Sequence, residues 1–242
     1  MPRFWISLIV PAYNEVERIS GTIKEAKLYF ERLGRPCEII VVADGTDGTR
    51  ELVEKMALTD PAIKVTGEAR RRGKGYGVRR GVAMAQGEII GYIDADNKTP
   101  IAEFDKFEPL LREGCEVVIG SRTLPDSSAG DRPVIRRLGA QGFAWVMHAL
   151  VGLRDIPDTQ CGFKFFSRRV ALDLFKRQTI DGYIFDVEIL HLARQAGYRI
   201  AQVPICWHDD GDSRLALFSG NLRNMVELLR IAFAPAARPS RD

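Results

Sequence analysis

Residues 88–96 read Glu-Ile-Ile-Gly-Tyr-Ile-Asp-Ala-Asp, an apolar segment that is followed at once by two acidic residues. A similar pattern occurs earlier, where Ile6–Val10 precedes Asn14-Glu15 and Glu38–Val42 precedes a loop with Asp44 and Asp47. Helical segments separate these apolar strands, which predicts an α/β fold with a mostly parallel, Rossmann-like central sheet flanked by helices. Ligands of such sheets bind at the carboxyl ends of the strands, so the polar residues found there form the candidate site.

Hydrophobic periodicity and turn residues give the expected order of elements. The expected strands are Ile6–Val10, Glu38–Val42, Ala62–Val65, Glu88–Ile93, Glu116–Gly120, Phe163–Phe166 and Val203–Trp207. The expected helices are Glu15–Leu33, Thr49–Met56, Tyr76–Ala85, Val134–Val151, Phe185–Ala196 and an amphipathic Leu222–Phe233. No internal repeat or linker is visible, so we expect a single domain over residues 1–233 and a frayed tail over 234–242.

The composition is that of a globular protein, because 45% of the 242 residues are apolar and 28% are charged. A net charge of +3 gives no general case for nucleic-acid binding. The four cysteines lie far apart without a CxxC pair, which favours a reducing cytosolic compartment over a zinc site or disulfide framework. The N-terminal apolar segment is too short for a signal peptide and ends at Pro11. No apolar run approaches the roughly 20 residues of a spanning helix, so we expect any membrane contact to be peripheral.

Basic residues gather at Arg70–Lys74, Arg79-Arg80 and Arg136-Arg137. Such clusters suit a phosphate-rich ligand or an anionic membrane surface, although a solvated helix face is the simpler explanation for any one of them. The segment Arg72–Gly75 precedes an expected helix. It could therefore place Lys74 and free backbone N–H groups near phosphates.

Asp94 and Asp96 are candidate metal ligands. Two carboxylates at a strand end can converge on a divalent cation, and Mg²⁺ takes oxygen ligands together with substrate phosphates. Reactions of sugar nucleotides use such a cation to neutralise the charge that develops on the leaving diphosphate. A solvated turn is the alternative, but the position directly after a strand favours the metal site.

The loop after the second strand also has two interpretations. Gly45 lets the backbone approach a ligand, and Asp44 can accept a hydrogen bond from a base or ribose. In the other interpretation the loop is a turn in which Asp47 or Thr49 caps the next helix.

Four segments occur in a fixed order: Ile9–Glu15 (IVPAYNE), Val41–Thr49 (VVADGTDGT), Arg72–Gly75 (RGKG) and Asp94–Asp96 (DAD). Together they resemble the GT-A domain of family 2 glycosyltransferases. The second half contains Gly120–Arg122 (GSR), Arg136-Arg137, Asp158–Phe166 (DTQCGFKFF) and Phe185–Leu190 (FDVEIL). These segments resemble dolichyl-phosphate glucose and mannose synthases, and the glucosyl type more closely. The resemblance extends from residue 6 to about residue 215.

The resemblance implies a GT-A fold with a nucleotide-sugar half over about residues 1–120 and an acceptor half over about 121–233. The residues implied for the nucleotide-sugar site, with Asp44 at the base, are Pro11, Tyr13, Glu15, Asp44, Gly45, Lys74, Asp94 and Asp96. Asp96 would be the closer ligand of a divalent metal (Mg²⁺ or Mn²⁺), with Asp94 beside it. The residues implied for the acceptor phosphate are Ser121, Arg122, Arg136 and Arg137. Arginine suits this task because its planar fork matches phosphate oxygens.

The implied reaction moves a hexose, with glucose favoured, from a nucleotide diphosphate sugar to a polyprenyl or dolichyl phosphate, with inversion. UDP-glucose is the favoured donor, and the expected location is the cytoplasmic face of a membrane surface, bound peripherally. A phosphate monoester has a second pKa near ~6, so it is already nucleophilic as a dianion and a strong base is unnecessary. If a base is used, Asp158 and Asp186 are candidates, and support of the site wall is their alternative role. The catalytic candidates are Asp94, Asp96, Arg122 and Asp186.

Three other functions stay open: a GDP-mannose-dependent transferase, a transferase acting on a saccharide hydroxyl, and a degenerate protein that only binds nucleotide sugars. A sugar-phosphate nucleotidyltransferase is disfavoured because its glycine-rich N-terminal fingerprint is missing. Ala43 and Lys98 depart from the family pattern and favour the degenerate protein, whereas the intact Asp94/Asp96 pair opposes it. The segment Trp207–Arg214 departs from the family's spacing, which leaves the role of His208 open.

The segment Val134–Val151 begins with two arginines and continues with bulky apolar residues such as Trp145. A helix of this kind could lie in a membrane interface, with a lipid phosphate beside Arg136-Arg137. An ordinary core helix is the alternative. The segment after Leu222 is a second, weaker membrane candidate.

Overall fold

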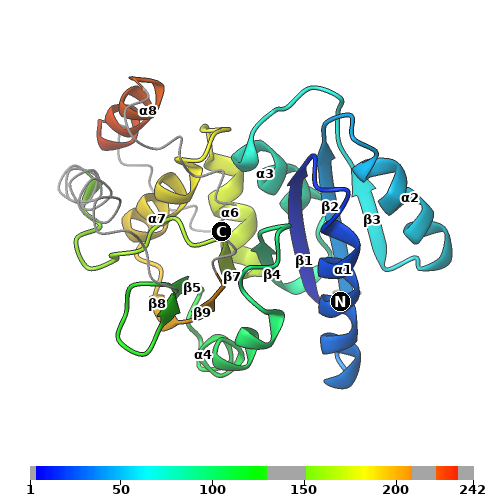
Figure 1. Cartoon of the computed structure of the whole chain (residues 1–242). Coiled ribbons are helices and arrows are strands. Elements are labelled where there is room, and N and C mark those ends of the chain that lie inside the picture. The colour runs from blue at the N-terminus through cyan, green and yellow to red at the C-terminus, as the bar shows by residue number, and fades with distance from the viewer. Residues whose placement is uncertain (1–3, 130–150, 209–221, 234–242) are drawn as a thin grey trace.

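The fold is described from a computed structural model, which covers residues 4–129, 151–208 and 222–233 (Figure 1). The strands are β1 (Phe4–Tyr13), β2 (Cys37–Asp44), β3 (Ile63–Thr66), β4 (Gly87–Ile93), β5 (Val117–Ser121), β6 (Ser128–Ala129), β7 (Phe163–Ser167), β8 (Ile200–Pro204) and β9 (Cys206–Trp207). The helices are α1 (Ile19–Arg32), α2 (Thr49–Thr59), α3 (Lys74–Met84), the 3-10 helix η1 (Ile101–Lys106), α4 (Glu108–Arg112), α6 (Arg168–Arg177), α7 (Phe185–Gln195) and α8 (Leu222–Ala232).

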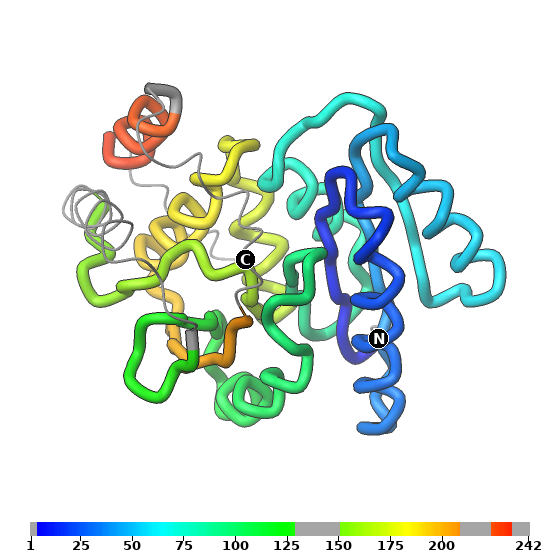
Figure 2. Tube along the Cα trace, viewed as in Figure 1, coloured from blue at the N-terminus to red at the C-terminus, as the bar shows by residue number. Residues whose placement is uncertain are grey.

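The central sheet has the strand order β3-β2-β1-β4-β7-β5-β8. Its neighbouring strands are parallel except at β7, which runs antiparallel to both β4 and β5. The carboxyl ends of β4 and β5 therefore lie on either side of the amino end of β7. Figure 2 follows the chain from the N-terminal elements on one side of the molecule to the C-terminal elements on the other.

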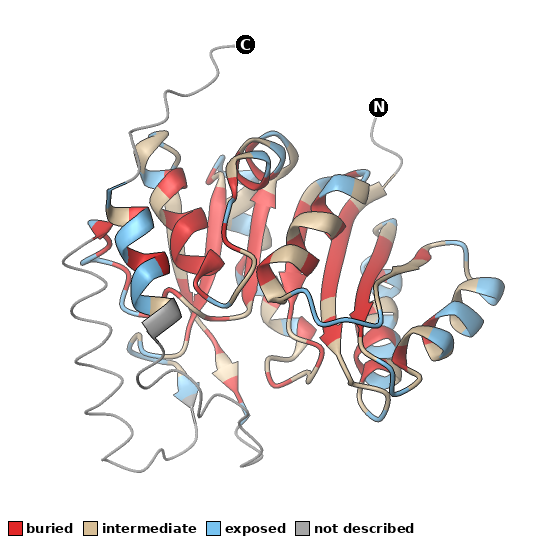
Figure 3. Cartoon of the chain, turned by 90° about the horizontal axis from the view of Figure 1, so that it is seen from above, coloured by how far each residue is buried: buried red, intermediate tan, exposed pale blue. Residues whose placement is uncertain are grey.

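Side chains alternate between the two faces of the sheet, as expected for extended strands. In β1, Leu8 and Val10 point into a core shared with α1 and η1, whereas Ile9 points into a core shared with α3, α6 and α7. Seen from above, buried strands lie between helices whose outward sides are exposed (Figure 3). The predicted α/β class, with a mostly parallel sheet flanked by helices, is confirmed.

Three predicted boundaries were wrong. β1 continues beyond Pro11, although proline has no backbone N–H to donate. Its pairing with β4 ends at Ile9, and beyond that point β1 is paired only with β2, so a proline is tolerated there. The first helix begins at Ile19 rather than Glu15. The strand expected over Val203–Trp207 is two strands: β8 ends at Pro204, and β9 then pairs with β6 instead of β5. The sequence patterns also missed α4, η1, α6 and β6.

The predicted helix Val134–Val151 lies outside the described residues except for Val151, so Arg136, Arg137 and Trp145 are not placed. The C-terminal segment forms α8, with Leu228 and Ile231 buried. Met225, Val226, Leu229 and Phe233 are exposed large apolar residues in the same segment. In the parts of the chain that the structure describes, no helix has the length and hydrophobicity needed to span a bilayer.

Candidate functional site

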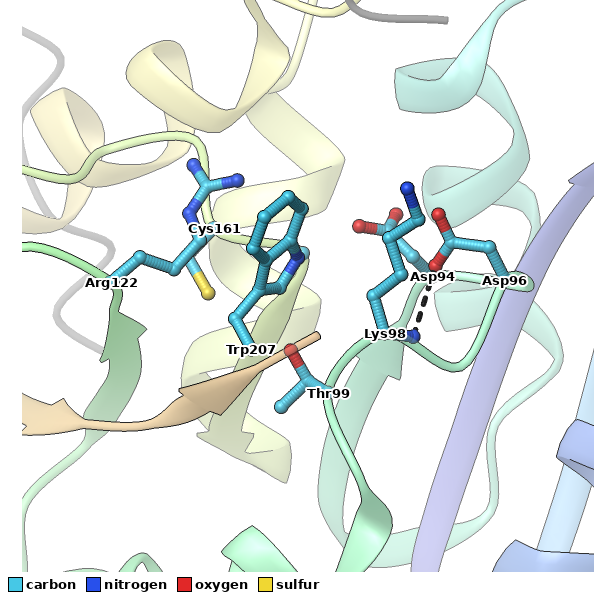
Figure 4. A pocket seen from close by; sticks show the side chains of 8 residues that line it. Asp94, Asp96, Lys98, Thr99, Arg122, Cys161 and Trp207 are labelled. Carbon is cyan, nitrogen blue, oxygen red and sulfur yellow. Dashed lines mark hydrogen bonds between the residues drawn. The ribbon is translucent and has the colours of Figure 1, made fainter. Parts of the chain in front are cut away.

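A pocket opens at the carboxyl edge of the sheet, where β4 and β5 end and β7 begins (Figure 4). The residues that line it are Asp94, Asp96, Lys98, Thr99, Arg122, Cys161, Gly162 and Trp207. The two carboxylates follow β4, and Arg122 follows β5. The structure thus brings together three of the predicted site residues from two separate segments of the sequence.

Asp94 forms an ion pair with Lys74, the first residue of α3, with 2.6 Å between Oδ1 and Nζ. Burial disfavours the charged form of Lys74, but the carboxylates of Asp94 and Asp186 outweigh it and raise the pKa of Lys74. The backbone of Gly162 lies against the same carboxylate, and a Cβ at that position would overlap Asp94. The RGKG segment and the acidic pair are therefore in direct contact.

Asp96 is partly buried, and its Oδ1 accepts a hydrogen bond of 3.3 Å from the backbone N–H of Lys98. Burial and the neighbouring Asp94 carboxylate raise the pKa of Asp96. Within residues 4–129, 151–208 and 222–233, no group of three or more His, Cys, Asp or Glu side chains could hold a metal ion. Two carboxylates in a pocket still fit Mg²⁺ or Mn²⁺, because such ions bind through one or two carboxylates plus substrate phosphates.

Arg122 stands across the pocket in a two-pronged ion pair with Asp158. Its Nε and Nη2 each donate to the Asp158 carboxylate at 2.8 Å, and its backbone N–H donates to Asp158 Oδ2 at 2.8 Å. Burial opposes ionisation of Asp158, yet Arg122 outweighs it and lowers the pKa of this carboxyl. Asp158 therefore orients Arg122. This contact favours a supporting role for Asp158 over the role of a base.

Asp186 lies in a buried network rather than in the lining of the pocket. Its side chain is 2% exposed and forms a 2.5 Å ion pair with Lys164, which is fully buried. Tyr92 donates its hydroxyl to the same carboxylate, and Lys164 donates to the carbonyl of Cys161 at 2.5 Å. This placement favours a role for Asp186 in supporting the pocket wall over the predicted catalytic role, because its carboxylate already accepts hydrogen bonds from Lys164 and Tyr92.

Residues predicted for the nucleotide lie at the ends of β1 and β2, which run side by side with Tyr13 opposite Asp44. Asp44 is buried, and its carboxylate accepts backbone N–H groups of Glu68 and Arg72 at 3.1 and 2.9 Å. It therefore fixes the loop after β3, a task that the sequence did not reveal. Arg71 of this loop lies over the ring of Tyr13 at 4.5 Å from its centroid and donates to the hydroxyl of Tyr183 at 2.9 Å.

The remaining predicted nucleotide residues surround the same strand ends. Pro11 pairs in register with Val42, and the backbone N–H of Glu15 donates to Thr49 Oγ1 at 2.9 Å. Gly45 has a φ of 112°, and a Cβ there would overlap Asn14, so the glycine is required by the turn itself. Asp47 accepts the backbone N–H of Thr49 at 3.0 Å and so closes the turn, but the N-cap of α2 is Gly48, without a side-chain cap hydrogen bond, and not the predicted Asp47 or Thr49.

Of the four residues predicted for the acceptor phosphate, the structure describes Ser121 and Arg122. Ser121 is fully buried with its hydroxyl 3.2 Å from Thr123 Oγ1, and it is not among the residues that line the pocket. Arg136 and Arg137 lie outside the described residues. The sequence patterns missed the lining residues Trp207 and Gly162, because only the tertiary fold brings them beside Asp94.

Neither histidine in the described part of the chain lines this pocket. His191 is half-buried on α7 with Nδ1 2.9 Å from the carbonyl of Val151, which is a structural contact. His208 is exposed, and its backbone N–H donates to the carbonyl of Lys98 at 2.9 Å. The backbone of His208 therefore joins the end of β9 to the loop that carries Asp96.

The sequence model of Glycosyl transferase family 2 matches residues 7–175, which is more than half of the chain. The chain belongs to this family. Among curated members, it is 35% identical to the dolichyl-phosphate beta-glucosyltransferase ALG5C of Trichomonas vaginalis, over 94% of this chain and 71% of the relative. It is 33% identical to the dolichyl-phosphate beta-glucosyltransferase of Mus musculus, over 96% of this chain and 78% of the relative.

Solved structures of other glycosyltransferases share the fold. Glucosyl-3-phosphoglycerate synthase from Mycobacterium tuberculosis, in complex with Mn²⁺, UDP and phosphoglyceric acid, aligns with a TM-score of 0.68 and 24% identity, over 96% of this chain and 80% of that one. Mannosyl-3-phosphoglycerate synthase from Rubrobacter xylanophilus aligns with a TM-score of 0.66 and 20% identity, over 94% and 71%. At these identities the likeness establishes the fold alone, and with the family match it confirms the predicted GT-A architecture.

Proposed function

We propose that this family 2 glycosyltransferase moves glucose from UDP-glucose to a dolichyl or other polyprenyl phosphate, with inversion at the anomeric carbon. The observation that carries the proposal is the 31–35% identity to dolichyl-phosphate beta-glucosyltransferases over at least 90% of the chain. The pocket supports it, because carboxylates for a diphosphate–metal group stand across from an arginine. The glucose would be transferred across this gap.

The chain's own residues supply positioning and charge rather than a base. Asp96 and Asp94 would hold a divalent cation, Mg²⁺ or Mn²⁺, which neutralises charge on the departing diphosphate when it is bound. Arg122, oriented by Asp158, would face the acceptor phosphate. Because that phosphate is a dianion at neutral pH, its oxygen can attack directly. The reaction then needs no general base, so Asp158 and Asp186 can serve as supporting residues.

The nucleotide sugar would bind in the half over about residues 1–120, at the ends of β1, β2 and β4. The acceptor would bind in the half over about 121–233. Since a polyprenyl phosphate resides in a bilayer, we infer that the protein works peripherally at a membrane surface, on its cytoplasmic side. Arg136 and Arg137 are retained as further candidates for the lipid phosphate.

The test is incubation of the protein with Mn²⁺ or Mg²⁺, a panel of UDP- and GDP-sugars and a short polyprenyl phosphate, followed by detection of lipid-linked sugar. We expect product from UDP-glucose, loss of product with EDTA, and tighter calorimetric binding of UDP than of GDP. Preference for GDP-mannose would replace the glucosyl assignment with a mannosyl one. Binding of nucleotide without transfer or hydrolysis would support the degenerate protein instead.

A further inference from the structure

Arg122 by itself is a weak receptor for a doubly charged phosphate. Two of its guanidinium nitrogens already donate to Asp158, whose carboxylate is buried, and the formal charges of this pair cancel. Recognition of a phosphate dianion is strongest where donors carry net positive charge. A second cation facing the same space would therefore matter for binding.

Lys98 supplies a cation in the same pocket. It is buried, at 7% exposure, and its Nζ lies 5.4 Å from the ring centroid of Trp207. The guanidinium carbon of Arg122 lies 5.7 Å from the same centroid. Figure 4 shows Trp207 between the two side chains, with the ammonium and the guanidinium directed toward the same side of the pocket. Contact of each cation with the indole helps to hold it there.

Backbone hydrogen bonds connect the three segments that carry Asp96 and Lys98, Trp207 and His208, and β6. Lys98 donates its N–H to Asp96 Oδ1 at 3.3 Å and accepts the N–H of His208 at 2.9 Å. Trp207 itself belongs to β9, which pairs with β6. The backbone of Lys98 is thus held between the loop of the acidic pair and β9, and its positive charge also favours the ionised form of the neighbouring Asp96.

We propose that Lys98 and Arg122, on either side of Trp207, form the subsite for the phosphate monoester of the acceptor. This inference rests on the proposed function and adds Lys98 and Trp207 to it. A phosphate held by both cations would lie on the Trp207 side of the pocket, whereas the donor diphosphate would lie at Asp94 and Asp96. Attack on the anomeric carbon requires the two phosphates on opposite sides of the sugar, which this arrangement provides.

The test compares Lys98→Met, which keeps the length of the side chain and removes its charge, with wild type and with Lys98→Arg. Lys106→Met is the matched control, because Lys106 is an exposed lysine paired with Glu103 on η1. Binding of farnesyl monophosphate and of inorganic phosphate is measured by calorimetry without donor, and UDP binding is measured with Mn²⁺. Transfer kinetics then give KM for the lipid acceptor.

We expect Lys98→Met to weaken farnesyl monophosphate binding, and to raise the acceptor KM, by at least about tenfold, since hydrogen bonds to charged groups carry energies of that size. UDP affinity should change less than twofold, Lys98→Arg should recover most of the loss, and Lys106→Met should match wild type. If inorganic phosphate shows the same Lys98 dependence, the subsite recognises the phosphate itself; if only the farnesyl compound binds, the lipid contributes to the recognition.

Two results would overturn the subsite. One is a loss of UDP affinity with an unchanged acceptor KM, which would assign Lys98 to the donor. The other is farnesyl monophosphate binding that is insensitive to Lys98→Met. Failure of the proposed function is a separate result, because wild type would then bind farnesyl monophosphate through Lys98 without transferring glucose to it.

Discussion

Two cation–carboxylate pairs face each other across the pocket and differ in exposure, and the proposed function assigns one to a donor wall and the other to an acceptor wall. On the donor wall (Lys74, Asp94 and Asp96), the Asp94 side chain is 45% exposed and meets Lys74 through one short contact. On the acceptor wall (Arg122, Asp158 and Trp207), the Asp158 side chain is 5% exposed and accepts two guanidinium bonds. The first carboxylate is free to change partners when a ligand arrives, whereas the second holds one arginine in one orientation.

The difference separates function from stability within one pocket. An ion pair with one exposed partner contributes less to the free energy of unfolding than a fully buried pair, so changes in the donor wall should cost the fold less, although Lys74 is itself only 13% exposed. A buried pair is different, since removal of one partner leaves a largely buried charge uncompensated. Substitutions in the donor wall should therefore mainly lower the rate of transfer, and substitutions in the acceptor wall should mainly lower the free energy of unfolding.

The largest expected effect is on the donor wall. Asp96→Ala should lower the rate of transfer by about a thousandfold or more, because removal of groups that stabilise developing charge has effects of that order. The fold should stay intact, as measured by urea denaturation and circular dichroism. Glu54→Ala, an exposed acidic position on α2, serves as the control. Turnover like that of wild type at saturating metal would remove Asp96 from the reaction.

The acceptor wall should give the largest change in stability. Asp158→Ala should reduce the free energy of unfolding by about 3 kcal/mol, because Arg122 would lose its buried partner. Asp94→Ala should cost less than Asp158→Ala, because the Asp94 carboxylate is 45% exposed, but it should still destabilise the fold, because Lys74 is 13% exposed and would lose its partner. Urea denaturation of both variants measures the contrast. The double variant Arg122→Met/Asp158→Leu should be less destabilised than the sum of its single changes, and simple additivity would contradict a coupled pair.

A smaller effect should appear in the pH dependence of stability. The folded-state pKa of Asp158 is lowered, so its contribution is fully present above the unfolded value of about 3.9 and is lost as the pH falls through the folded value. Wild type and Asp158→Asn should therefore differ most in urea midpoint near neutral pH, and the difference should shrink below about pH 4. Asp47 and Asp60 also have lowered pKa values but are common to both proteins. A constant difference down to about pH 2.5 would exclude this assignment.

The donor wall was also the more predictable of the two. Asp94 and Asp96 follow an apolar strand directly, and strand ends of parallel sheets meet at one edge, so local pattern was enough to place them. The acceptor wall depends on the antiparallel β7 and on the β9–β6 pairing, which bring Asp158 and Trp207 from distant segments to Arg122. Nothing in the local pattern distinguishes Ser121, which is buried, from its neighbour Arg122, which lines the pocket.

The position of β7 also sets how wide the pocket can be. The strands that carry the two walls, β4 and β5, are not neighbours, because β7 lies between them and pairs with both. Two interstrand spacings amount to about 9.6 Å, a length dictated by backbone hydrogen bonds and not by side chains. Loops around the rim can therefore diverge while the separation between the ends of β4 and β5 stays constant. A change in that separation would require a strand to be added to or removed from the sheet.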